Sequence, residues 1–222
     1  MEDVTYLNDE LATVQSRNNL FDISLFKSTE YFASIETFVG FVKACEKMIR
    51  GSSEYKVYKA QLMEQGLTRC QFLGAIEADE DDAVTIEMHH GPILTLFDYV
   101  AIVIDWLLKK ERPVNTFIVT RIVLNEHFEG NVQTVMLSKT VHQLVDSGEI
   151  FIHFNQGTGN LNRFLEKYRD GLNDERISKI NQYIKLCELY ENSFDNGLLD
   201  LRKNITDWDY EAAKNRMKKD DE

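Results

Sequence analysis

The sequence predicts an α+β fold that is mostly helical and carries a small antiparallel sheet near the middle of the chain. Two patterns lead to this prediction. Apolar residues recur at helical spacing over long stretches on both sides of the centre, whereas two shorter runs, 70–77 and 83–90, alternate apolar and polar residues as strands do. The polar turn Ala78-Asp-Glu-Asp-Asp82 separates the two runs, so we expect them to form a β-hairpin.

The N-terminal third of the chain is predicted to be helical after an initial arm. Residues 1–27 have no sustained period, so we expect them to be extended. Over 28–49 apolar residues recur every three or four positions, which predicts a first long helix. Ser52 or Ser53 is expected to cap a second helix, which Gly66 ends.

Two apolar helices are predicted after the hairpin, over about 95–110 and 114–128, and Gly130 ends the second. Pro113, between them, is favourable at a helix start. Ser138 is a good N-cap for a short helix further along. The remaining elements follow from the same patterns: strands over 132–137 and 149–154, and helices over 139–146, near 160–172 and over about 174–191.

Composition narrows the class of protein. A chain of 25.8 kDa with 43% hydrophobic residues is long enough to bury a real core. Its three cysteines are widely spaced and odd in number, which indicates neither a disulfide framework nor a thiolate zinc site and favours a reducing, intracellular setting. The net charge of −12 argues against non-specific coating of nucleic acid, which relies on Lys and Arg, but leaves a metal-bridged phosphate contact open.

No membrane association is expected. The N-terminus lacks the basic-then-apolar pattern of a signal peptide. The most apolar stretch, 93–108, contains Asp98 and Asp105 and is shorter than the roughly 20 residues of a membrane span. We therefore expect a soluble, cytoplasmic protein.

Histidines provide the most informative pattern, because all five lie between positions 89 and 153. His89 and His90 are adjacent at the end of a predicted strand, and His142 and Asp146 are four residues apart on one face of the predicted helix over 139–146. If that helix packs on the strand, His89, His142 and Asp146 can bind one Mg²⁺, Mn²⁺ or Zn²⁺ ion and leave positions open for water and phosphate.

His90 points away from His89 along a strict strand, but near the strand end it is a candidate general base that takes a proton from water. Asn131, at the mouth of the partner strand, is expected to hold the other ring nitrogen of His90. Lys139 and Arg121 are candidate phosphate contacts on sequence proximity alone.

The order His89-His90, Asn131, then His142 with Asp146 resembles the HNH nuclease family. In its ββα-metal fold, a strand ends in (Asp/His)-His, an Asn precedes a second strand, and a helix carries the last ligands. The likeness covers at most residues 70–155. This chain departs from the family at three points. Ser138 and Val141 stand where many members have a zinc-binding cysteine pair, and Asp146 stands where a His is more usual. About forty residues separate His90 from Asn131, where many members have a short loop.

This resemblance implies a metal-dependent endonuclease whose partner is nucleic acid, DNA more than RNA. It divides the chain into an N-terminal helical region (1–69), an HNH-like core (70–155) with a helical insertion (about 93–129), and a C-terminal helical region (156–222). The N-terminal helices and the hairpin also resemble uncharacterised bacteriophage proteins with degenerate HNH segments, which implies a phage protein acting in the cytoplasm of a bacterial host.

An alternative remains open: an inactive HNH-derived phage protein that binds a host or viral protein. The acidic balance and the two inserted helices favour it. Local structural roles are also expected for two histidines, with His127 charged at a helix C-terminus and His153 on a strand. The nuclease hypothesis fails if His89, His142 and Asp146 cannot converge.

Overall fold

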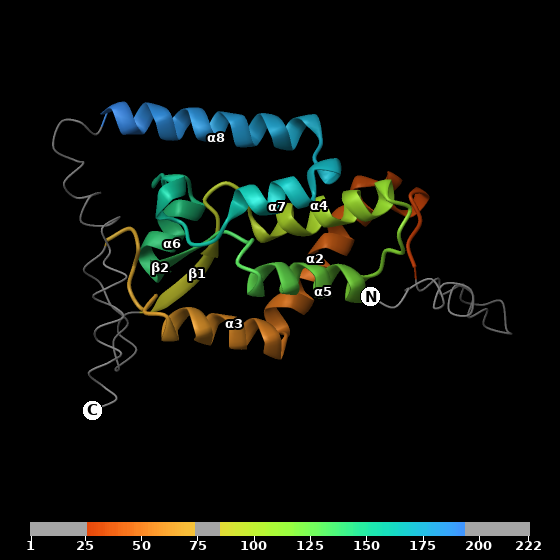
Figure 1. The fold of residues 1–222 in the computed structure, drawn as a ribbon, viewed down its shortest axis with the longest axis horizontal. Coiled ribbons are helices and arrows are strands. Elements are labelled where there is room, and N and C mark those ends of the chain that lie inside the picture. The colour runs from red at the N-terminus through yellow and green to blue at the C-terminus, as the bar shows by residue number, and fades with distance from the viewer. Residues whose placement is uncertain (1–25, 74–84, 194–222) are drawn as a thin grey trace, which may run out of the picture.

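The structure is a computed structural model that describes residues 26–73 and 85–193. Its described part is mostly helical, with one two-stranded antiparallel sheet, which confirms the α+β prediction (Figure 1). The strands are β1 (Ile86–His90) and β2 (Thr134–Ser138). The helices are η2 (Glu30–Ala33), α2 (Ile35–Gly51), α3 (Ser53–Glu64), α4 (Leu96–Lys109), α5 (Thr116–Phe128), α6 (Lys139–Asp146), η3 (Phe154–Gln156), α7 (Leu161–Lys167), η4 (Arg169–Gly171) and α8 (Asp174–Ser193).

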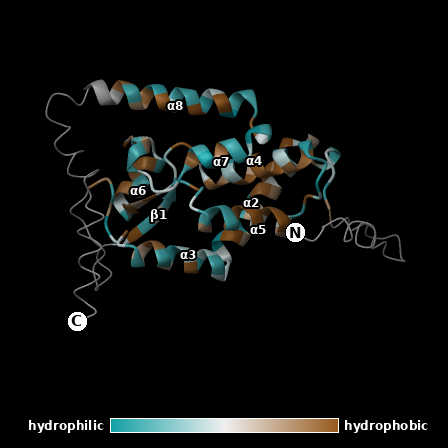
Figure 2. Ribbon diagram, viewed as in Figure 1, coloured by the Kyte–Doolittle hydropathy of each residue, from teal (hydrophilic) through white to brown (hydrophobic). Residues whose placement is uncertain are grey.

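Helix α4 forms the centre of the core and packs against α2 and α5. Every residue from Tyr99 to Ile104 is fully buried, so this helix is apolar on nearly all sides, as a helix surrounded by others must be. Figure 2 shows the apolar residues concentrated where these helices meet. One hydrophobic cluster runs from Phe41 to Ile180 and joins the N-terminal helices, the inserted helices and the sheet.

Side-chain caps mark the starts of α4 and α5. Thr95 and Asp98 form a capping box at the start of α4. The α5 helix begins at Thr116, slightly later than predicted, because the Asn115 side chain accepts a hydrogen bond from the Ile118 N–H at 2.8 Å. Within the described residues, no helix is long and apolar enough to cross a membrane.

The sheet pairs β1 with β2 in antiparallel register, with His89 opposite Val135 and His90 opposite Thr134. Helix α6 follows β2 directly and packs on both strands. Its bounds match the prediction, and Gly148, with a φ of +78°, lies just beyond its end. The prediction placed the hairpin over 70–90 and the strand over 132–137 in one sheet, with the helix over 139–146 packed on it. Among the described residues, the pairing of 86–90 with 134–138 and the packing of α6 on both strands are confirmed.

Two strand predictions need correction. Within the predicted strand over 70–77, residues 71–73 form a turn. The rest of that strand, the predicted turn over 78–82 and the start of the next strand lie outside the described residues, as do residues 1–25 and the chain beyond 193. The second prediction, a strand over 149–154, is wrong because His153 and Gln156 form a capping box that starts η3. Such local hydrogen bonds compete with strand pairing.

The C-terminal helices lie on the same side of the molecule as α6 (Figure 1). The single helix predicted near 160–172 is split into α7 and η4. Polar and aromatic contacts attach α8 to the rest of the fold. The Tyr183 ring stacks on Phe151, and its hydroxyl donates to the Ile152 carbonyl. Two ion pairs join α8 to α4: Lys179 with Asp98 and Arg176 with Asp105.

Candidate metal centre

His89, His142 and Asp146 lie together at the surface, where α6 covers the sheet. Each offers one ligand atom, and these atoms all lie within 4.8 Å of one another. The Asp146 carboxylate is 3.7 Å from His89 Nδ1 and 3.6 Å from His142 Nε2. The two imidazole rings meet edge to face with centroids 4.8 Å apart. The predicted set of three residues is therefore brought together by the fold.

Strand alternation and helix periodicity explain this convergence. Along β1, Ile86, Met88 and His90 are buried, whereas Glu87 and His89 are only half-buried on the opposite face. That second face is the one against which α6 packs, as the contact between His89 and His142 demonstrates. On α6, residues four apart share a face, so His142 and Asp146 both point towards His89.

Glu87 belongs to the same cluster and was not predicted from the sequence. Its Oε2 lies 2.7 Å from His142 Nδ1, which donates the hydrogen bond when the imidazole is neutral. This contact leaves the His142 Nε2 lone pair facing Asp146. A carboxylate behind a histidine ligand fixes its tautomer in the same way in many metal sites. The signal in the sequence was the i−2 spacing of Glu87 from His89 on a strand, which puts both on one face.

His89 is suited to bind a metal as a neutral imidazole. Burial, followed by the neighbouring His142, lowers the pKa of His89. Gly91 makes room for the ring, because a Cβ at that position would lie 2.9 Å from His89 Cδ2 and Nε2. A larger residue at position 91 would therefore displace the ring.

The chemistry of the three donors fits a divalent ion. Two imidazole nitrogens and one carboxylate oxygen are a common zinc set, and in a tetrahedron with bonds of about 2.0 Å the ligand atoms stand roughly 3.3 Å apart. His89 Nδ1 lies 3.7 Å from one Asp146 oxygen and His142 Nε2 lies 3.6 Å from the other, and the ligand atoms of the three residues all lie within 4.8 Å of one another. The Asp146 side chain is 64% exposed, so the cluster opens to solvent at this residue.

His90 faces the opposite side of the sheet, away from this cluster. It is 4% exposed, stacks on Tyr55 of α3, and its Nε2 lies 2.9 Å from Nε2 of His127 on α5. Burial is the main cause that holds the pKa of His90 well below its ordinary value, with His127 the next. The predicted role as general base requires His90 to reach a water molecule at the cluster. The geometry does not support this role, because the side chain lies on the other face of the sheet.

Asn131 does not contact His90 either, so that predicted contact is corrected. Its side chain is buried and donates to Glu126 Oε2 at 2.6 Å and to Glu129 Oε2 at 3.1 Å. Gly130, with a φ of +70°, turns the chain so that the Asn131 N–H bonds back to the Glu126 carbonyl. Glu126 also accepts from Tyr168 and Lys167, which makes this group a buried structural network.

The remaining candidates have different surroundings. Lys139 is exposed at the start of α6, one turn before His142, whereas Arg121 is exposed on α5, the helix whose His127 contacts the other face of the sheet. His127 was expected to be charged, but burial lowers its pKa to about 4, and its Nδ1 lies 2.7 Å from the Val123 carbonyl. His153 is buried and caps η3.

Comparison with known proteins identifies one family. No curated protein and no solved structure matches the chain. A family model described as bacteriophage G278-like virion protein matches residues 2–211, and that description names a particle component and no nuclease. The match spans nearly the whole chain, which therefore belongs to the bacteriophage G278-like virion protein family.

Proposed function

We propose that this virion protein binds one divalent metal ion through His89, His142 and Asp146, and that the ion has a structural role in a particle component whose partners are viral proteins. The observation that carries the proposal is the convergence of these three side chains from β1 and α6, with ligand atoms within 4.8 Å of one another. The hydrogen bond from His142 to Glu87 supports it, because it orients a ligand nitrogen towards the other two.

An ion bound at this position would stabilise the small sheet. The described sheet has only two strands, and two-stranded sheets are marginally stable without support from other elements. An ion held by one strand and one helix fastens α6 to β1, and its binding free energy adds to the free energy of unfolding. Zn²⁺ matches the two-nitrogen, one-oxygen donors best, Mn²⁺ is next, and Mg²⁺ prefers oxygen ligands.

Two further observations favour a structural role over catalysis. Hydrolysis of a phosphodiester needs a base near the metal-bound water, and His90 is buried on the other face of the sheet. The chain also carries a net charge of −12, which opposes the approach of a nucleic-acid backbone. Protein partners are what a virion component needs in order to assemble.

Calorimetric titration of the purified chain with ZnCl₂, MnCl₂ and MgCl₂ tests the proposal. We expect one site per chain, tightest for zinc, and its loss in His89→Ala, His142→Ala and Asp146→Asn. Gln143→Ala is the matched control, because Gln143 is exposed on the same helix and belongs to no cluster of metal-binding side chains found among the described residues. Absence of binding to the wild type at neutral pH would remove the proposal.

A second candidate is an HNH-like endonuclease that acts on DNA rather than RNA. Two observations favour it: an antiparallel strand pair runs directly into a helix that carries two of the three ligands, and Asp146 is exposed to solvent. Lys139 and Arg121 are its candidate phosphate contacts. Metal-dependent cleavage of plasmid DNA by the wild type, lost in His89→Ala, would establish it. If catalysis is absent, both proteins leave the plasmid intact while only the wild type binds metal.

A further inference from the structure

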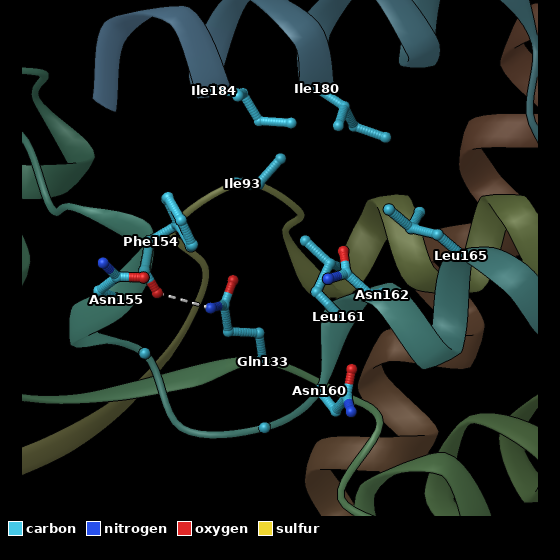
Figure 3. A pocket seen from close by; sticks show the side chains of 12 residues that line it. Ile93, Gln133, Phe154, Asn155, Asn160, Leu161, Asn162, Leu165, Ile180 and Ile184 are labelled. Atoms are coloured by element: carbon cyan, nitrogen blue, oxygen red, sulfur yellow. Dashed lines mark hydrogen bonds between the residues drawn. The ribbon is translucent and has the colours of Figure 1, made fainter. Parts of the chain in front are cut away.

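A cavity of about 510 Å³ lies between α8, α7 and the loop around η3 (Figure 3). Its apolar wall comes from four segments of the chain: Ile93, Phe154, Leu161, Leu165, Ile180 and Ile184. The polar groups in the lining are all amides: Gln133, Asn155, Asn160 and Asn162. Of the described residues that line the cavity, none carries a charge, although the chain as a whole is strongly acidic.

Gln133 forms the floor of the cavity and is 5% exposed. Its Nε2 donates to the Phe154 carbonyl at 2.8 Å, which fixes the orientation of the amide, since the flipped amide would oppose two oxygens. Its Oε1 then faces the cavity and has no hydrogen-bond partner (Figure 3). Such buried acceptors are uncommon because they lose water without gaining a donor.

The surrounding backbone holds Gln133 in this position. Its own N–H donates to the Tyr99 hydroxyl at 2.9 Å, and its carbonyl accepts from the Gly91 N–H at 3.3 Å. Gly157 allows the loop to close on the Gln133 side chain, because a Cβ there would lie 2.7 Å from Gln133 Cγ. The acceptor is therefore held rigidly, as a binding site requires.

We propose that this cavity binds an uncharged, apolar peptide segment of another virion protein, whose main-chain N–H donates to Gln133 Oε1. The unpaired acceptor calls for a donor, and every residue of a peptide except proline carries a main-chain N–H. The uncharged lining excludes charged side chains, which would be buried without a partner. Phe154 and Ile184, 38% and 39% exposed, present apolar surface for side chains of the segment.

The source of the segment follows from the family. A virion component is surrounded by other proteins of the particle, so a protein segment is the ligand that such a cavity meets. The cavity is also separate from the metal cluster, whose residues are absent from its lining. The inference therefore stands independently of metal binding.

The test uses the full-length, ¹⁵N-labelled chain and N-acetyl-leucyl-leucine N-methylamide as the probe. We expect saturable shifts of the Gln133 side-chain NH₂ resonance. Each N–H of the probe is then methylated in turn, and one of these analogues should bind about tenfold more weakly, the usual effect of losing one hydrogen bond. A probe that leaves the Gln133 resonance unmoved, or analogues that all bind equally, would overturn the proposal.

Ile184→Asp puts a charge at the cavity and should weaken probe binding at least tenfold. Ile177→Asp is the matched control, since Ile177 lies on the same helix, is 43% exposed and is absent from the cavity lining. Both positions are surface-exposed, so both variants should fold. His142→Ala should bind the probe normally, which separates this proposal from the metal site. Concentration-dependent dimerisation that Ile184→Asp abolishes would instead assign the cavity to a second copy of the chain and overturn the proposal.

Discussion

His89 and His90 are neighbours in the chain, yet the two faces of the β1–β2 sheet surround them with opposite environments. On the α6 face, His89 is half-buried beside His142 and Asp146, and solvent reaches the cluster through Asp146. On the other face, His90 is enclosed by Tyr55 of α3 and His127 of α5. A histidine beside an exposed carboxylate and one enclosed in the core are therefore separated by one step of strand alternation.

The two faces of the sheet also separate the residues that resemble a nuclease motif. A tandem histidine provides a ligand and a base only if the strand ends or bends so that both rings reach the same solvent. Here His90 remains paired in register with Thr134. Its Nδ1 has no hydrogen-bond partner, and its Nε2 contacts a residue 37 positions away. The His90 side is thus part of the core, whereas the His89 side carries a cluster of polar side chains that solvent reaches.

The largest expected effect comes from the buried face. His127→Ala leaves His90 Nε2 without its partner and opens a cavity beside Tyr55 and Tyr58, so the free energy of unfolding should fall by about 2–4 kcal/mol. Urea unfolding of the metal-free protein measures this loss. His142→Ala on the other face should cost less than about 1 kcal/mol under the same conditions. Equal losses would break the contrast between the two faces.

Zinc should stabilise the wild type only by binding to the cluster on the α6 face of the sheet. At a free concentration one hundred times the dissociation constant, the free energy of unfolding should rise by about 2.7 kcal/mol. Thermal unfolding with and without zinc measures the shift. We expect the same shift in Gln143→Ala and no shift in Asp146→Asn or His142→Ala. A full shift in either ligand variant would mean that the ion binds elsewhere.

Acid should destabilise the buried face. The pKa of His127 is lowered from an ordinary 6.5 to about 4, first by burial, so the unfolded chain takes up a proton at a higher pH than the folded protein does. This contribution to stability is complete above pH 6.5 and is lost as the pH falls towards 4. Between pH 7 and 4.5 it amounts to about 1–3 kcal/mol.

The pH effect is read as a difference between variants, because carboxylates also titrate in this range. Stability should fall less steeply with pH in His127→Gln than in the wild type when urea unfolding is followed at both pH values. A wild-type slope in His127→Gln would show that the buried histidine does not cause the acid sensitivity.

The smallest effects on zinc binding are expected from residues that contact the ligand side chains but do not bind the ion themselves. Glu87→Gln should weaken zinc binding about 10-fold to 100-fold, because the tautomer and orientation of His142 are no longer fixed by a carboxylate. Calorimetry measures the change, and a normal melting temperature without metal would confirm that the fold is intact. Unchanged zinc affinity in Glu87→Gln would show that Glu87 does not contribute to binding. Gly91→Ala, which crowds the His89 ring, should act in the same direction and more weakly.

The sequence by itself determined the local structure that creates the cluster. Alternation over 83–90 predicted that His89 and His90 face opposite ways, and the Ser138 and Gly148 boundaries predicted α6 over its observed range. Together with the i, i+4 spacing of His142 and Asp146, these patterns were enough to predict which three residues would meet. They act over one or two turns of helix or a few residues of strand, where backbone geometry alone fixes direction.

Tertiary structure decided everything that depends on contacts between distant segments. The burial of His90 depends on α3 and α5 packing against the sheet, and Asn131 is directed to Glu126 by a turn and by the approach of α7 with Lys167. Glu87 acquires its partner from 55 positions away, and the Gln133 acceptor lies in a cavity that α7, α8 and the η3 loop enclose. The sequence pattern gives the direction of a side chain, but burial and hydrogen-bond partners depend on which segments pack over it.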